Sequence, residues 1–133
     1  SLEAFGLGPA LRKLCHEIQE NGKIRINLMG ENIASKPGSR ISIYIYRIIQ
    51  EALNNIIRHS RASLAWISFI ELHEMLRIEI RDNGIGMPNA DKAIGSGQGL
   101  FNMRERVKIL GGEMRLHSML NEGTTILIDI PWK

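Results

Sequence analysis

The order of predicted elements favours a two-layer α/β sandwich, with a mixed, mostly antiparallel sheet of about five strands and about three helices on one face. Three segments carry apolar residues at helical spacing, and five others have the composition or alternation of strands. The last four strands form two hairpins. Helices are expected at residues 7–20, 39–56 and 100–110, and strands at residues 23–29, 64–72, 75–82, 113–119 and 124–130.

Size and composition indicate one globular domain over residues 1–133. The chain is 44% hydrophobic and 23% charged, which is ordinary for a single soluble core. Its 17 Lys and Arg residues are scattered among 14 acidic ones, so we expect no nucleic-acid partner. The single cysteine, Cys15, excludes an internal disulfide and is expected to be a buried thiol in a cytoplasmic domain. No apolar run approaches a bilayer span, although a membrane anchor elsewhere in a longer parent protein stays open.

The first two elements are defined by their apolar periodicity. Leu11, Leu14 and Ile18 lie on one face of the first helix, and Asn21 with Gly22 supplies its stop. The strand after it alternates polar residues with three apolar ones. These are Ile24, Ile26 and Leu28.

The second helix is the best-defined element, and it has two faces. Ser39 is a plausible N-cap, and one apolar face continues as far as Ile56. Its polar stripe can meet a hydrated Mg²⁺ ion through a carboxylate and an amide, and phosphate through cationic groups. The alternative is an ordinary solvated helix face with weak ion pairs. The stripe consists of Arg47, Glu51, Asn55 and Arg58.

The first hairpin leads into a glycine-rich stretch at residues 83–99, which is expected to be a long functional loop. Asp82 stands at the end of the second strand of this hairpin. Its carboxylate could accept a hydrogen bond from an amino-bearing base, while the following glycines let the backbone approach a ligand. An ordinary Asp-Asn-Gly turn is the alternative.

The third helix follows directly after the glycines of this loop, and Gly111 with Gly112 ends it. Free N–H groups at a helix N-terminus attract phosphate. The segment matches neither a Rossmann fingerprint nor a Walker loop, because no strand immediately precedes it and the Gly-Lys-Ser/Thr ending is absent. A turn at residues 121–123 joins the last two strands.

Four motifs in this order resemble the catalytic domain of histidine kinases, within the group that includes DNA gyrase, heat-shock chaperone ATPases and mismatch-repair ATPases. The N box is similar to residues 47–60 (RIIQEALNNIIRHS), and the glycine boxes to residues 82–87 (DNGIGM), 97–106 (GQGLFNMRER) and 123–125 (GTT). The resemblance covers nearly the whole chain. It is strongest to the subfamily that pairs with response regulators carrying helix-turn-helix outputs, and it implies the Bergerat ATP-binding fold.

The resemblance implies that the polar stripe binds Mg-ATP. Asn55 would ligate Mg²⁺, and Glu51 would act beside it through water or the metal; these two residues would be the catalytic pair. Arg58 and His59 would face the phosphates. Other relatives often carry a small or hydroxyl residue where this chain has Asn54.

The resemblance also implies a base pocket and a lid. Asp82 would accept the adenine amino group, with Thr124 nearby, and residues 87–98 would form the ATP lid. The phenylalanine-centred box of other histidine kinases is absent here, in agreement with the subfamily. Glycines and one following residue would shape the pocket or cradle phosphate with their backbone. These are Gly84, Gly86, Gly97, Gly99 and Leu100.

The implied activity is donation of the γ-phosphate of ATP to a histidine outside this chain. The acceptor would lie on a helical dimerisation domain of the same parent protein, with a response regulator downstream. The parent would be a homodimer and the fragment a monomer. Two alternatives share the fold: an ATP-driven conformational clamp, and a serine kinase acting on an anti-sigma antagonist. A nucleotide-binding module without phosphotransfer is a third.

Overall fold

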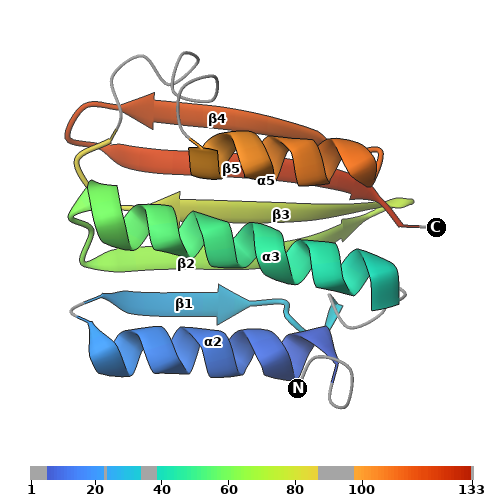
Figure 1. Cartoon of the computed structure of the whole chain (residues 1–133), viewed down its shortest axis with the longest axis horizontal. Helices are drawn as coiled ribbons and strands as arrows, with labels where there is room; N and C mark the ends of the chain where they lie inside the picture. The colour runs from blue at the N-terminus through green and yellow to red at the C-terminus, as the bar shows by residue number, and fades with distance from the viewer. Residues whose placement is uncertain (1–5, 23, 34–38, 87–97, 133) are drawn as a thin grey trace.

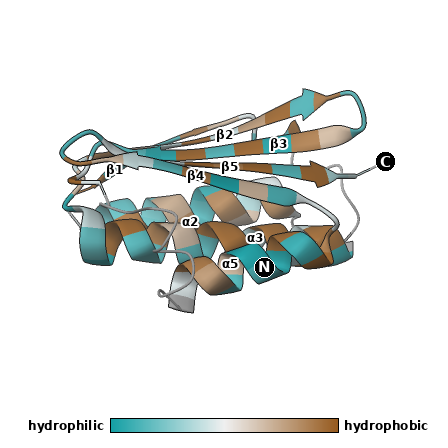
Figure 2. Cartoon of the chain, turned by 90° about the horizontal axis from the view of Figure 1, so that it is seen from above, coloured by the Kyte–Doolittle hydropathy of each residue, from teal (hydrophilic) through white to brown (hydrophobic). Residues whose placement is uncertain are grey.

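The chain folds into one five-stranded sheet with helices packed against one of its faces (Figures 1 and 2). The computed structural model describes residues 6–22, 24–33, 39–86 and 98–132. The predicted α/β sandwich is confirmed. Within the described residues the helices are α2 (Leu7–Asn21), α3 (Ser39–Asn55) and α5 (Gln98–Ile109), with a π-helical turn η2 (Ile56–Ser60). The strands are β1 (Arg25–Met29), β2 (Leu64–Leu72), β3 (Met75–Asp82), β4 (Glu113–Met119) and β5 (Gly123–Pro131).

The sheet is mixed because its first two strands are joined through a helix. The strand order is β1-β2-β3-β5-β4, and β1 pairs parallel with β2. A parallel pair needs a crossover connection, which α3 supplies. The remaining pairs are antiparallel, so both predicted hairpins are confirmed. The pairing of β3 with β5 joins segments far apart in the sequence and sets Asp82 opposite Thr124.

The core lies between the helices and the inner face of the sheet. Ile45, Ile48 and Ile49 of α3 are fully buried, as the apolar periodicity predicts. Cys15 is also buried, and burial together with the nearby Glu31 charge raises the pKa of its thiol to about 11. The thiol is therefore protonated and inert at neutral pH. Within the part of the chain that the structure describes, none of the helices combines the length and apolar character needed to span a bilayer.

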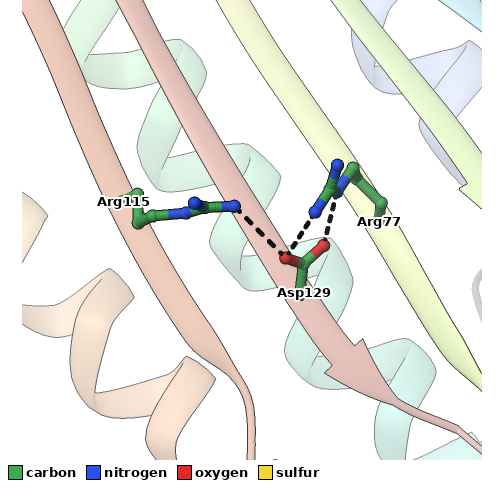
Figure 3. A network of polar contacts seen from close by, with 3 residues as sticks. All are labelled: Arg77, Arg115 and Asp129. Carbon is green, nitrogen blue, oxygen red and sulfur yellow. Dashed lines mark hydrogen bonds and ion pairs between the residues drawn. The ribbon is translucent and has the colours of Figure 1, made fainter.

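The outer face of the sheet carries charged side chains, and none of the described helices covers it (Figure 2). Arg77 donates two hydrogen bonds to Asp129, at 2.7 and 3.0 Å, and Arg115 approaches the same carboxylate at 3.7 Å (Figure 3). The Arg81 guanidinium lies 4.1 Å from the centroid of the Trp66 ring. These cross-strand contacts on β2, β3, β4 and β5 are typical of a solvated sheet face.

One element differs from its predicted form in a way that concerns the site. The second helix was expected to continue regularly to Ile56, but the α-helix ends at Asn55 and a π-helical turn follows. Arg61 then adopts a left-handed conformation with φ 55° and ends the segment. Apolar spacing cannot predict this change from α-helix to π-helix. Ser60, at the end of the π-helical turn, contacts Gly84 and Ile85, which are distant in the sequence. Turns of this kind are rare and often occur at functional sites.

Truncation of the buried face of α3 should lower stability strongly. Ile48 has 0% of its surface exposed, so Ile48→Ala should reduce the free energy of unfolding by about 2 to 5 kcal/mol through lost burial and a residual cavity. Ile43 of the same helix is 43% exposed, and Ile43→Ala should change it by less than about 1 kcal/mol. Urea denaturation followed by circular dichroism measures both values. Equal losses would contradict this assignment of the two helix faces.

Candidate functional site

Polar residues from distant parts of the chain meet at one end of the sheet, where α3 and β3 end and β5 begins (Figure 1). Asp82 is the last residue of β3, and only 5% of its surface is exposed. It lies opposite Thr124, which is 8% exposed. The Gly84 N–H donates a 2.8 Å hydrogen bond to Asp82 Oδ1. Sequence segments 82–84 and 124 are thus brought together as predicted.

The Asp82 carboxyl is held in a water-poor environment. Burial raises its pKa above the ordinary value of 3.8, and the backbone amides of Gly84 and Thr124 oppose this rise. A carboxylate offers about four lone-pair positions, so two amides leave it able to accept further hydrogen bonds. This arrangement suits a ligand that brings an amino group, because an unpaired buried carboxylate is otherwise costly.

Two hydroxyl groups on the neighbouring strands β5 and β4 contact each other at this end of the sheet. Thr124 Oγ1 and Ser118 Oγ are 2.8 Å apart, and Ser118 Oγ donates to the Gly123 carbonyl at 3.2 Å. Either hydroxyl can donate in this pair, and a threonine hydroxyl oxygen has two lone pairs, so Thr124 Oγ1 keeps acceptor capacity. Ser118 was not singled out from the sequence, because only the β4–β5 register brings it to Thr124.

The glycines after Asp82 are required by close packing. A Cβ on Gly84 would lie 2.2 Å from the Ser60 carbonyl oxygen, which no side chain could tolerate. Gly86 has φ +74°, and a Cβ there would lie 2.1 Å from the Met119 carbonyl oxygen. The loop therefore passes directly over the end of η2 and the β4–β5 turn. These backbone contacts set the path of the loop and require glycine at both positions, whether or not a ligand is bound.

A second polar group lies between α3 and the first turn of α5. A Cβ on Gly99 would come within 3.0 Å of both Asn55 Oδ1 and Glu51 Oε2, so these side chains face the N-terminus of α5. The Asn55 Nδ2 atom is buried and has no hydrogen-bond partner in the described structure. The Leu100 side chain is 5% exposed and belongs to the core, so only its backbone can serve this site.

The predicted polar stripe of the second helix is divided into two parts. Glu51 and Asn55 are half-buried toward α5, whereas Arg58 and His59 are exposed on η2. Arg47 donates to Gln50 at 2.9 Å. Within the described ranges, no ion pair joins Arg47 or Arg58 to Glu51.

Some predicted residues fall outside the description, and some useful ones were overlooked. Gly97 and all but the last residue of the predicted 87–98 lid lie outside the described residues. Asn83 was read only as part of a turn, but its Oδ1 accepts hydrogen bonds from the Ser63 and Leu64 N–H groups, each at 3.0 Å. An Asn directly after a strand is the sequence feature that could have indicated such side-chain hydrogen bonds to the backbone.

A family profile decides the assignment of this site. The profile described as histidine kinase-, DNA gyrase B-, and HSP90-like ATPase matches residues 40–133. The chain belongs to this ATPase family. The match includes α3, η2, the Asp82 loop, α5 and the β4–β5 hairpin, which together form the site. The resemblance stated from the sequence motifs is therefore confirmed at the level of the family.

Curated relatives extend the similarity to the N-terminal part of the ATPase-family chain. It is 29% identical over 131 residues to the oxygen sensor histidine kinase NreB of Staphylococcus carnosus, covering 98% of this chain and 38% of the relative. It is 33% identical over 131 residues to the signal transduction histidine-protein kinase/phosphatase DegS of Brevibacillus brevis, covering 98% and 34%. The chain thus spans little more than a third of each relative's length.

Solved structures of histidine kinases share the fold. The histidine kinase domain of the Erythrobacter litoralis EL346 blue-light activated kinase superposes with a TM-score of 0.80 and 25% identity, covering 95% of this chain and 61% of that one. The ATP binding domain of PrrB from Mycobacterium tuberculosis has a TM-score of 0.77 at 18% identity, covering 96% and 94%. The second likeness concerns the fold alone.

The side chains present fit a nucleotide that carries its own metal. Among the described residues, no group of three or more His, Cys, Asp or Glu could hold a metal by itself. Mg²⁺ commonly binds through few protein ligands, substrate phosphates and water. The Asn55 side chain beside Glu51 and the α5 N-terminus is compatible with that mode, because its Oδ1 is a hard oxygen ligand and a phosphate oxygen could accept from its unpartnered Nδ2.

The burial of Asp82 should cost stability at neutral pH. Because its folded-state pKa lies above 3.8, the folded protein binds this proton more tightly than the unfolded chain. The contribution to the free energy of unfolding therefore falls as pH rises through this window. Asp82→Asn removes the ionisation, so the variant should be at least as stable as wild type at pH 7. Urea denaturation at pH 7 and pH 3.5 measures this, and a large loss at pH 7 would contradict it.

Proposed function

We propose that this chain binds Mg-ATP and donates the γ-phosphate to a histidine on a separate helical phosphoacceptor domain, as part of two-component signalling. The proposal rests chiefly on one observation. A buried carboxyl acceptor, Asp82, stands at the end of the sheet, and Asn55 with its unpartnered amide faces the first turn of α5. The two groups have the chemistry needed for the base and the phosphates of one nucleotide.

The base side of the site would select adenine through hydrogen-bond acceptors. Asp82 accepts from the exocyclic amino group, and Thr124 Oγ1 offers a second acceptor beside it. Gly84 and Gly86 let the loop after Asp82 pack directly against the backbone of Ser60 and Met119. A base with an oxo group at the same position would set oxygen against carboxylate, which is unfavourable in a desolvated site.

The phosphate side would use helix ends and polar side chains. Asn55 Oδ1 is the proposed Mg²⁺ ligand, and Glu51 orients water or the metal shell. Bound Mg²⁺ supplies positive charge that offsets the charge of the phosphates. Arg58 and His59 on the exposed face of η2 reach toward phosphate, while the α5 backbone at Gly99 and Leu100 donates to it. Gly97 and the proposed lid complete this side.

The proposed partners follow from the relatives' names and from the chain's own chemistry. NreB and DegS are named as histidine kinases. A phosphoacceptor helical domain of the same parent and a response regulator are the proposed partners here, with the parent a homodimer and this fragment a monomer. Protein groups contribute position and charge, since phosphoryl transfer needs little covalent help.

Nucleotide binding should depend on Asp82 and on Asn55 in different ways. Titration with a non-hydrolysable ATP analogue should give saturable binding that Mg²⁺ strengthens. Asp82→Asn should weaken it about 10- to 100-fold, because a charged acceptor is lost. Asn55→Ala should remove most of the Mg²⁺ dependence. Isothermal titration calorimetry with and without Mg²⁺ measures all three proteins.

Matched controls lie on the outer face of the sheet. Asp129→Asn and Asn27→Ala change the same residue types away from the site and should bind the analogue like wild type. If folded wild type shows no binding at millimolar analogue, the proposed function is rejected. If Asp82→Asn binds as well as wild type, the base assignment is wrong.

Glu51 should matter more for transfer than for binding. When the domain is mixed with a dimeric histidine-bearing helical domain and γ-labelled ATP, label should reach the helical domain as acid-labile phosphohistidine. Glu51→Gln should slow this transfer about 100-fold or more and change analogue affinity little. Glu113→Gln, on the exposed edge strand β4, is the control.

The products of the same assay separate the alternatives. Steady ATP hydrolysis with nucleotide-dependent dimerisation would favour the conformational clamp. Phosphoserine on a partner would favour the anti-sigma type of kinase. Binding without any transfer would leave a regulatory nucleotide-binding module.

A further inference from the structure

We propose that Ser60 is a positioning residue of the nucleotide site, which holds the phosphate-side helix end in its π-helical form against the base-side loop. This inference rests on the proposed function, because it concerns how that site is kept in order. Ser60 is 9% exposed and is the last residue of η2. It lies between Asn55, at the end of α3, and Gly84, in the loop after Asp82.

The Ser60 hydroxyl uses its hydrogen-bonding capacity within the turn. Its proton is donated to the Ile56 carbonyl at 2.7 Å, and its oxygen accepts from the Ala62 N–H at 3.1 Å. The first bond spans the π-helical turn, and the second fixes the chain just after the left-handed Arg61. The hydroxyl therefore links the start of η2 to the segment that leads into β2.

The backbone of Ser60 makes a separate contact to the base-side loop. Its carbonyl accepts from the Ile85 N–H at 2.7 Å, and Gly84 packs so closely that a Cβ there would lie 2.6 Å from Ser60 Cβ. Other bonds also hold this loop, including Asp82 to the Gly84 N–H and Asn83 to the β2 start. Removal of the Ser60 hydroxyl would leave these contacts in place.

The two halves of the site should consequently respond differently to loss of the hydroxyl. Without it, the Ile56 carbonyl loses the hydroxyl donor and the Ala62 N–H loses the hydroxyl acceptor, and the residues of η2 can return to α-helical winding. A change of winding turns Arg58 and His59 about the helix axis, because the residues of a π turn advance by a smaller angle than those of an α-helix. The phosphate side would be misplaced while Asp82 stays in position.

The test is to compare a triphosphate ligand with a ligand that lacks phosphates. Ser60→Ala should bind the Mg²⁺-loaded ATP analogue about five- to tenfold more weakly than wild type, the effect of one buried hydrogen bond. Its affinity for adenosine, measured by NMR titration, should be unchanged. Ser60→Thr retains the hydroxyl and should bind the analogue nearly as wild type does. Ser63→Ala is the matched control, since Ser63 is exposed in the same connection and its hydroxyl accepts from Asn83.

Ser60→Cys guards against failure of the alanine variant to fold. It has nearly the same volume and a weak hydrogen-bonding group. It should lie between wild type and Ser60→Ala in analogue affinity, with adenosine binding intact.

Each outcome bears on a different statement. Analogue affinity in folded Ser60→Ala or Ser60→Cys equal to that of wild type would overturn the inference. Equal loss of analogue and adenosine binding, unrelieved by Ser60→Thr, would mean that Ser60 only supports the fold, and this also overturns it. If wild type binds neither ligand, the proposed function fails and the inference falls with it.

Discussion

The packing of α3 against the inner face of the sheet is the constraint on which the site depends. Ile45, Ile48 and Ile49 on its inner face are fully buried, and this fixes the rotation of the helix about its axis. That rotation turns Glu51 and Asn55 toward α5, and the antiparallel arrangement of α3 and α5 brings the first turn of α5 to them (Figure 1). A different rotation would bury these polar groups in the core at a cost of several kcal/mol. The packing of α3 in the core therefore also sets the orientation of Glu51 and Asn55 in the site.

The end of the sheet beside α3 carries features that do not favour stability. Asp82 is buried and its pKa is raised, Asn55 Nδ2 lacks a partner, and α3 passes into a π-helical turn. Each departs from regular, fully paired structure, although Arg106 Nη1 and Trp132 Nε1 are also buried without a hydrogen-bond partner among the described residues. Such departures concentrate where binding requires unsatisfied or strained groups. Their common position at one end of the sheet is an argument for a ligand that satisfies them together.

The opposite face of the sheet is organised differently. Its cross-strand charges and the Arg81–Trp66 contact satisfy one another on the surface. The two faces of the sheet thus have different roles. The inner face packs against the helices and positions the site, and the outer face is solvated. Family membership agrees with this division, because the profile match includes the segments that carry the site and the strands β2 to β5.

The sequence by itself determined the elements and the hairpins, because helical and strand periodicities are local properties. It also predicted a set of site residues, because the four motifs stand close to element ends. The β-strand alternation predicts a hairpin but not that β5 pairs with β3 and sets Asp82 opposite Thr124. Only tertiary structure decided that pairing, the half-buried state of Glu51 and Asn55, and the π-helical turn. Ser60 ends the N-box match, but the sequence indicated no role for it, because its contact with Gly84 joins positions 24 residues apart. Contacts between distant segments depend on how helices and strands pack, and periodicity within one segment carries no information about that.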